Sequence, residues 1–362
     1  MSVLNGGKLP LMFRNELGLC KLKPGDQVVL VTDLATRQDY VQAAFAAAED
    51  LGAKVFEVKI STPFDRSMIA SQGGAHTIEN LPAVVNAVEN ADLVLVFHVA
   101  LGAEWLQRGR KKGVRFLLVI DGPDELLSLS PAVGMKEAIH YCRDLMSRTR
   151  EMHVTSAAGT DFKARFGSLG TVVQYGYADE PGHVDTWGGA HFSSWPDVDT
   201  SEGVVVLDAG DCWVLPYVRY VESPVRLVVR DGYIREVQGS GVDAKLFRQY
   251  CDSWKKHADD MEPYAVSHLG WGLNPNSVID QIAQTGVDMS RVASHSRSWP
   301  GVFLFSTGPN DQGGGTNTTP AHLDLPMFNC SVALDGREVI RNGVIVDEKM
   351  KVPAGRLMKY LD

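Results

Sequence analysis

The sequence predicts an α/β fold in which an N-terminal doubly wound parallel-sheet domain is followed by an α+β domain. Apolar runs in the first 150 residues alternate with helical stretches, whereas later apolar runs are shorter and lie between glycine and proline. Several Asx-Gly pairs in the later part signal two-residue hairpins. Because 362 residues exceed what one compact core usually requires, we expect two domains, 1–150 and 151–362.

The first domain is expected to contain a parallel sheet covered by helices on both faces. An alanine-rich helix at 40–51 follows the first of the buried-strand patterns, which fall at 27–33, 53–60, 91–98 and 114–121. Sheets of this kind bind ligands at the carboxyl ends of their strands. The polar residues at those ends are Asp33, His98 and Asp121. No glycine-rich nucleotide motif follows these strands, so a nucleotide-binding function has little support.

The second domain is expected to be rich in antiparallel strands and to follow a helix at 135–150. Its strand-like runs fall at 171–175, 204–207 and 225–230, with a further helix at 242–257. Hairpin turns are expected at Asp231-Gly232, Asp335-Gly336 and Asn342-Gly343.

The composition excludes several classes of protein. Lys and Arg total 35 against 44 Asp and Glu, and the net charge of -9 argues against nucleic acid or an anionic membrane as the main partner. No window of 18 apolar residues is present, and we expect neither a membrane span nor a signal peptide. The 5 cysteines are scattered, without a C-x-x-C pair, which excludes a cysteine-built zinc site and favours reduced thiols in the cytoplasm.

Histidines gather in three contexts after residue 150. His322 and Asp324 follow the glycine-rich segment 308–319, and in a strand they share a face, so that both can bind one metal ion. A third ligand would complete a two-histidine, one-carboxylate site with open positions on Fe(II). His268 lies among small residues, where a strand can end against a ligand.

The third context competes with the first. His183 and Asp185 form another H-x-D motif, with His191 close by in the sequence. Such motifs arise by chance in a chain rich in His and Asp, and spacing alone does not choose between the clusters. The alternative interpretation of His322 and Asp324 is a hydrogen-bonded pair that stiffens the neighbouring loop.

Nearby residues have ordinary structural interpretations beside the functional ones. The tryptophans close to these histidines in the sequence can line the pocket of a flat ligand, but tryptophans are more often core residues. They are Trp187, Trp195 and Trp271. Ser306 can orient a water or oxygen, or be a plain hydrogen-bonded strand serine. Neither a G-x-S-x-G elbow nor an H-E-x-x-H helix is present, which argues against serine hydrolases and zincin peptidases.

At these residues the sequence resembles the 2,5-dihydroxypyridine 5,6-dioxygenases, which are related to the thermophilic-type (M29) metallo-aminopeptidases. The likeness covers most of the chain and is sharpest at 267–275 and 321–326. It implies an Fe(2+) cofactor on His268, His322 and Asp324. It also implies catalytic roles for His98 and His191, and it places His183 and Asp185 outside the metal shell.

Departures from the peptidases favour ring cleavage. The peptidases hold two metal ions and carry a glutamate where this chain has His268, and no histidine lies between 302 and 308 to supply a further ligand. One set of two histidines and an aspartate suits a single Fe(II). The resemblance thus implies a dioxygenase that converts 2,5-dihydroxypyridine and O2 to N-formylmaleamic acid. The 187–190 stretch departs from the family pattern, so a related hydroxylated N-heterocycle or phenol stays open as substrate.

Two other functions are compatible with the sequence. A dinuclear aminopeptidase-like hydrolase would work without oxygen, and a non-enzymatic binding protein would use the histidines as polar lining. We expect the protein to bind a small aromatic substrate and O2. We also expect a homo-oligomer that works in the cytoplasm.

Overall fold

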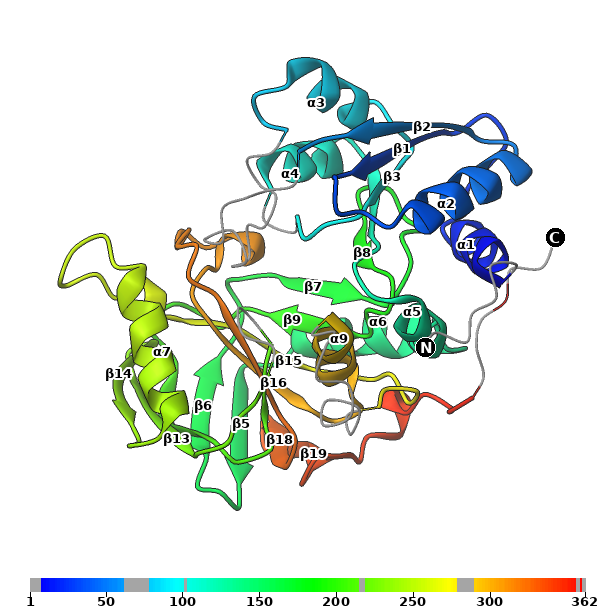
Figure 1. Ribbon diagram of the computed structural model, residues 1–362. Coiled ribbons are helices and arrows are strands. Elements are labelled where there is room, and N and C mark those ends of the chain that lie inside the picture. The colour runs from blue at the N-terminus through cyan, green and yellow to red at the C-terminus, as the bar shows by residue number, and fades with distance from the viewer. Residues whose placement is uncertain are drawn as a thin grey trace. The chain divides into compact units, whose positions relative to one another are not determined.

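The chain forms two compact units, each built from more than one segment (Figure 1). The first comprises residues 1–131, 174–189 and 356–362, and the second comprises 132–173 and 190–355. These come from a computed structural model that describes residues 8–61, 78–100, 103–214, 219–278, 290–355 and 359. The units are not divided by one boundary near residue 150. Helix α6 (Met135–Met146) belongs to the second unit, and strand β8 (Val184–Thr186) returns to the first.

The first unit is built on a five-stranded parallel sheet. Its order is β2-β1-β3-β4-β8, and all its neighbouring strands run parallel. The four predicted strands are confirmed, with shorter bounds: β1 (Gln27–Thr32), β2 (Lys54–Lys59), β3 (Leu93–Val96) and β4 (Arg115–Leu118). β8 was not expected; it pairs with β4 and thereby brings a piece of the later chain into this sheet.

Helices pack against this sheet as the apolar pattern predicts. Apolar side chains of α3 and α4 form one core with side chains of the sheet. The helices contribute Val85, Val88, Trp105 and Leu106, and the sheet contributes Val29, Val94 and Phe116. Figure 1 shows α1 and α2 together on the other side of the strands. The helices of this unit are α1 (Lys8–Leu19), α2 (Gln38–Asp50), α3 (Pro82–Glu89), α4 (Glu104–Lys111) and α5 (Pro123–Ser128). Within the described residues, no helix combines the length and apolar character needed to cross a membrane.

The second unit contains a large antiparallel sheet. Its eight strands follow the order β14-β13-β10-β6-β5-β18-β19-β20. Their bounds are β5 (Glu151–Ser156), β6 (Asp161–Arg165), β10 (Glu202–Leu207), β13 (Val225–Arg230), β14 (Tyr233–Gln238), β18 (Cys330–Leu334), β19 (Arg337–Arg341) and β20 (Val344–Ile345). The three predicted hairpin turns are confirmed. In each, both turn residues have positive φ, for example 51° at Asp231 and 75° at Gly232, as a type I′ turn requires.

A second sheet of five strands carries the candidate site. Its order is β17-β16-β15-β9-β7, and Phe162 of β6 meets Phe305 of β16 edge to face, with ring centroids 5.7 Å apart. The bounds are β7 (Thr171–Gln174), β9 (His191–Ser194), β15 (Val266–Trp271), β16 (Phe303–Thr307) and β17 (Leu323–Met327). Smaller elements complete the unit: β11 (Cys212–Trp213), β12 (Arg219–Tyr220), α7 (Val242–Ser253), α9 (Ser290–Ser298), and the 3-10 turns at Glu262–Tyr264, Asp311–Gly313 and Glu348–Met350. The fold class predicted from the sequence is thus confirmed.

All five cysteines are buried and free, as their scattered spacing predicts. Burial raises the pKa of each thiol above its ordinary value, which keeps the thiols protonated and unreactive.

Candidate metal centre

Two histidines and one aspartate converge inside the second unit. The Nε2 atoms of His268 and His322 each lie 3.2 Å from Oδ1 of Asp324. Their ligand atoms all lie within 4.8 Å of one another, and all three residues are buried. Among the described residues, this is the one group of three or more such side chains close enough to hold a metal ion. The structure therefore brings together the three residues that the sequence selected.

Neighbouring strands of the five-stranded sheet place these side chains. Asp324 lies in β17 opposite Ser306 of β16, and His322 immediately precedes β17. His268 lies in β15 where the register with β16 shifts between Val266 and Leu269. A bulge of this kind re-aims a side chain, and bulges are common next to active sites. His322 and Asp324 share a face, as their spacing in a strand predicts.

The base of the loop before His322 requires glycine. Gly308 has a φ of 100°, and a Cβ built on it would lie 1.7 Å from the carbonyl oxygen of Ala321. A side chain at this position would push the loop away from the segment that carries His322. Gly308 N–H also donates to the carbonyl of Ala265, 2.9 Å away, which joins the loop to the residue before β15.

His322 is held through its ring and through its main chain. Its Nδ1 lies 2.8 Å from the carbonyl oxygen of Thr307. Because a carbonyl only accepts, Nδ1 carries a proton. Burial lowers the pKa of this imidazole, but the charge of Asp324 outweighs burial and raises that pKa, so that Nε2 can donate to Oδ1 of the carboxylate. The hydroxyl of Tyr250, from α7, accepts from His322 N–H at 3.0 Å and donates to His322 O at 3.2 Å.

His268 is supported by its strand neighbour and by an aromatic ring. The hydroxyl of Ser306 donates to the His268 carbonyl at 2.7 Å, so Ser306 is the hydrogen-bonded strand serine of the simpler interpretation. The Trp195 ring meets the imidazole of His268 edge on, with centroids 5.5 Å apart. Trp195 Nε1 and the Ser267 hydroxyl both donate to the carbonyl of Pro309. The other two tryptophans are core residues: Trp187 packs on Phe13, and Trp271 packs on Phe192.

The Asp324 carboxylate is the electrostatic centre of the group. Burial by itself would raise its pKa, but His322 and His268 outweigh burial and hold that pKa well below its ordinary value. Its other oxygen, Oδ2, lies 3.3 Å from Nη1 of Arg297, which comes from the end of α9. An ionised carboxylate beside two imidazole nitrogens is a donor set suited to a divalent cation.

His191 belongs to the same unit as this group. It begins β9 and forms a bridge with Gly272, next to the end of β15. Burial lowers its pKa to about 3, and the nearby charge of Arg297 contributes in the same direction. The imidazole is therefore neutral at pH 7, and its buried Nδ1 has no hydrogen-bond partner within the described parts of the chain.

His98 lies in the first unit, two residues beyond the end of β3. Neither of its ring nitrogens has a hydrogen-bond partner in the described segments. Burial lowers its pKa, while the charge of Asp33 opposes this shift. Asp33 itself accepts the N–H of Ala35 at 2.9 Å and so also caps its own turn.

The competing H-x-D motif has a structural role in the first unit. His183 Nε2 lies 2.8 Å from Oδ2 of Asp185, and its ring stacks on Tyr175 with centroids 4.6 Å apart. The fully buried Asp185 carboxylate also accepts backbone N–H groups from Tyr175, Gly176 and Thr186. These donors occupy the carboxylate and fix the segment that contributes β8.

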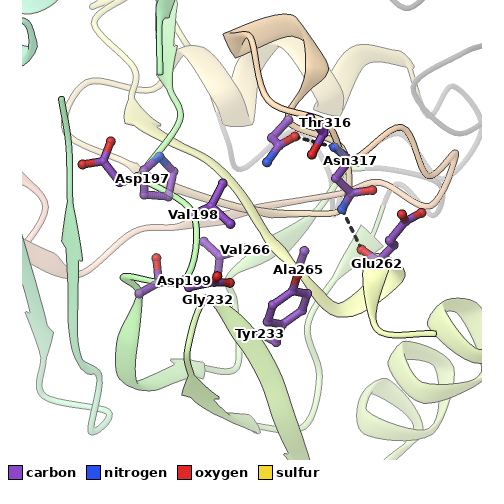
Figure 2. A pocket seen from close by; sticks show the side chains of 13 residues that line it. Asp197, Val198, Asp199, Gly232, Tyr233, Glu262, Ala265, Val266, Thr316 and Asn317 are labelled. Carbon is purple, nitrogen blue, oxygen red and sulfur yellow. Dashed lines mark hydrogen bonds between the residues drawn. The ribbon is translucent and has the colours of Figure 1, made fainter. Parts of the chain in front are cut away.

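A hollow lies beside the 308–319 loop, lined by the side chains drawn in Figure 2. Asn317 Nδ2 donates to the carbonyls of Glu262 and Gly308, at 3.1 and 2.9 Å, and Asn317 N–H donates to Oδ1 of Asn310. The loop is therefore braced at its base by main-chain and amide contacts. His268, His322 and Asp324 do not line this hollow.

The fold and this buried group define a protein with a candidate mononuclear metal centre of the two-histidine, one-carboxylate type. A family model described as 2,5-dihydroxypyridine 5,6-dioxygenase (NicX) matches residues 8–347. The chain is also 34% identical over 350 residues to 2,5-dihydroxypyridine 5,6-dioxygenase of Pseudomonas putida KT2440, an alignment that spans 95% of this chain and 97% of that protein. The chain belongs to the 2,5-dihydroxypyridine 5,6-dioxygenase family, as its sequence motifs imply.

Solved structures agree with this assignment. The structure of 2,5-dihydroxypyridine dioxygenase from P. putida KT2440 aligns with a TM-score of 0.88 at 33% identity, covering 96% of this chain and 100% of the other. Wild-type AmpT from Thermus thermophilus aligns with a TM-score of 0.61 at 14% identity, covering 94% and 99%. The second likeness shows a shared fold and carries no evidence about the reaction.

Replacing Tyr250 by Phe should destabilise the metal-free chain. The change leaves the main-chain N–H of His322 without its acceptor in a buried position, which typically costs about 1–3 kcal/mol. Urea denaturation of both chains measures the difference. Tyr141→Phe is the matched control. It also removes a partly buried hydroxyl that donates to a protein acceptor, the Asp347 carboxylate, but that carboxylate keeps its contact with Arg337 and is not left without a partner. Equal stability of Tyr250→Phe and the unaltered chain would contradict the role given to Tyr250.

Proposed function

We propose that the protein is an Fe(II)-dependent ring-cleaving dioxygenase that converts 2,5-dihydroxypyridine and O2 to N-formylmaleamic acid. The bond between ring carbons 5 and 6 breaks, and both oxygen atoms enter the product. Because one substrate and one O2 account for the whole product, the reaction needs no external reductant. The observation that carries the proposal is the buried set of two imidazoles and one carboxylate, in a chain that belongs to this family.

The residues present fit a single Fe(II). His268, His322 and Asp324 would hold it, because Nε2 of each histidine faces the ionised Asp324 carboxylate. A bound ion would take the place of a proton on Nε2 of His322. When bound, the ion would supply open coordination positions at which the substrate oxygen and O2 meet and exchange electron density. The set contains a single carboxylate, whereas dinuclear hydrolytic sites need several. This argues against a dinuclear site.

Proton transfers are assigned to two histidines outside the ligand set. His191 is proposed as one of them on the strength of the family resemblance, and its buried Nδ1, which has no hydrogen-bond partner among the described residues, can accept a hydrogen bond from a ring hydroxyl. His98 is proposed as the second proton-transfer group, on the strength of the family resemblance and of its two unpartnered nitrogens within the described segments. The Trp195 ring beside His268 can exclude water from that side of the imidazole.

Oxygen uptake and metal analysis test the proposal directly. The chain is purified without oxygen, its metal content is measured, and O2 consumption is followed after Fe(II) and 2,5-dihydroxypyridine are added. We expect one iron per chain and one O2 per substrate. Two zinc-like ions without oxygen uptake would favour the hydrolase instead. One iron without uptake would retain the metal site and reject this substrate in favour of another hydroxylated ring.

Substitution of two histidines should separate metal binding from turnover. His322→Ala removes a proposed ligand, so iron retention and activity should both be lost. His191→Ala leaves the ligand set intact, so iron should stay bound while kcat falls by about 100-fold or more. Iron content and kcat are measured on both variants. Full iron occupancy in His322→Ala, or an unchanged kcat in His191→Ala, would remove the corresponding role.

We also propose that the enzyme works in the cytoplasm as a homo-oligomer. Five free buried thiols support a reducing compartment. Strand β20 is an edge of the eight-stranded sheet, and its Val344 is 63% exposed, which favours pairing with another copy. Light scattering should give a mass above that of one 39.5 kDa chain. A monomeric mass at micromolar concentration would reject the assembly.

A further inference from the structure

The two oxygens of Asp324 face different partners. Oδ1 lies 3.2 Å from Nε2 of His268 and 3.2 Å from Nε2 of His322, so it points to the place where the three ligand atoms converge. Oδ2 lies 3.3 Å from Nη1 of Arg297. Both side chains are largely buried, with 12% of Arg297 and 6% of Asp324 exposed. A buried contact of this kind is screened far less than a surface ion pair.

Main-chain packing fixes the helix end that carries Arg297. Gly272, next to β15, has no side chain, and a Cβ there would lie 2.5 Å from the carbonyl oxygen of Arg297. The Asn274 N–H donates to the carbonyl of Ser298 at 2.7 Å, and Val278 N–H lies 3.0 Å from Nδ1 of His295. The last turn of α9 is thus held against the end of β15. Arg297 therefore reaches Asp324 from a rigid base.

A carboxylate can bind a metal through one oxygen or through both. The second mode uses one more coordination position, which a ring-cleaving enzyme needs for substrate or O2. Arginine is suited to prevent it, because its charge is permanent and its donors lie in a rigid plane. A charged hydrogen bond to Oδ2 competes with any approach of that oxygen to a metal ion.

We propose that Arg297 is a positioning residue that restricts Asp324 to a single-oxygen ligand and so keeps a coordination position open. The inference rests on the proposed function, because it concerns the iron held by His268, His322 and Asp324. It gives Arg297 an effect that a merely structural residue would not have. Its loss should leave metal binding as tight or tighter, since a cation is removed and Oδ2 is released, yet impair turnover.

Arg297→Met tests this inference through structure, affinity and kinetics together. Crystals of the unaltered chain loaded with Fe(II) without oxygen should show Oδ1 alone on the ion and Oδ2 on Arg297. In Arg297→Met, Oδ2 should move onto the ion. The Kd for Fe(II), measured by competition with a chelator, should be equal or lower, while kcat/KM falls about 10–100-fold, as is usual for residues that orient a ligand.

Arg219→Met is the matched control. Arg219 Nη2 lies 3.2 Å from Oδ1 of the fully buried Asp243 in the same unit, so this change removes an arginine–aspartate ion pair that includes none of the three metal ligands. It should change neither the coordination of Asp324 nor kcat/KM. Thermal denaturation of both variants reports any general loss of folding. If Arg297→Met does not fold, Arg297→Lys replaces it, because lysine keeps the charge but lacks the planar fork, and the same shift is expected to a smaller degree.

The outcomes separate this inference from the proposed function. Iron bound by both Asp324 oxygens in the unaltered chain overturns the inference and leaves the function intact. The positioning role of Arg297 is also rejected if Asp324 keeps one oxygen on the ion in the variant and kcat/KM is unchanged. A chain that takes up no iron at these three residues contradicts the proposed function itself.

Discussion

A carboxylate loses its hydration when it is buried, and it stays ionised only where nearby groups stabilise its charge. Asp324 meets this condition through two imidazoles on one oxygen and a guanidinium on the other. The surrounding structure provides these partners. Strand β15 brings His268 through a bulge, the segment before β17 brings His322, and the end of α9 brings Arg297. Loss of a single partner would leave part of this charge unbalanced in a site with little access to water.

Rigid supports around the centre come from ordinary main-chain chemistry. The Thr307 carbonyl selects one tautomer of His322, and Tyr250 binds both main-chain groups of the same residue. Glycines at 272 and 308 allow neighbouring backbone to approach more closely than any side chain would permit. These features add no charge and no reactive group to the site. They fix where the ligand atoms lie before any ion arrives, which limits the reorganisation that binding requires.

Local sequence patterns predicted much of this arrangement, but they did not predict contacts between residues that are far apart in the sequence. The alternation of side chains along a strand was enough to put His322 and Asp324 on one face, and Asx-Gly pairs were enough to predict three hairpins. Arg297 could not be selected, because an arginine at the end of a serine-rich helix carries no motif and only the packing of α9 brings it to Asp324. A boundary at residue 150 failed to anticipate β8, since a strand of three residues is too short to show a pattern.

The return of residues 174–189 to the first unit has a consequence for how the protein can be divided. A single cut at any position yields two fragments, and at least one of them lacks a segment of its own unit or carries a segment of the other unit. A fragment ending near residue 150 would lack β8 and expose the edge of β4, a surface open to pairing with other chains. The two halves therefore cannot behave as exchangeable modules. Insertions are better tolerated in exposed hairpin turns, such as residues 157–159 between β5 and β6, than where the chain passes from one unit to the other.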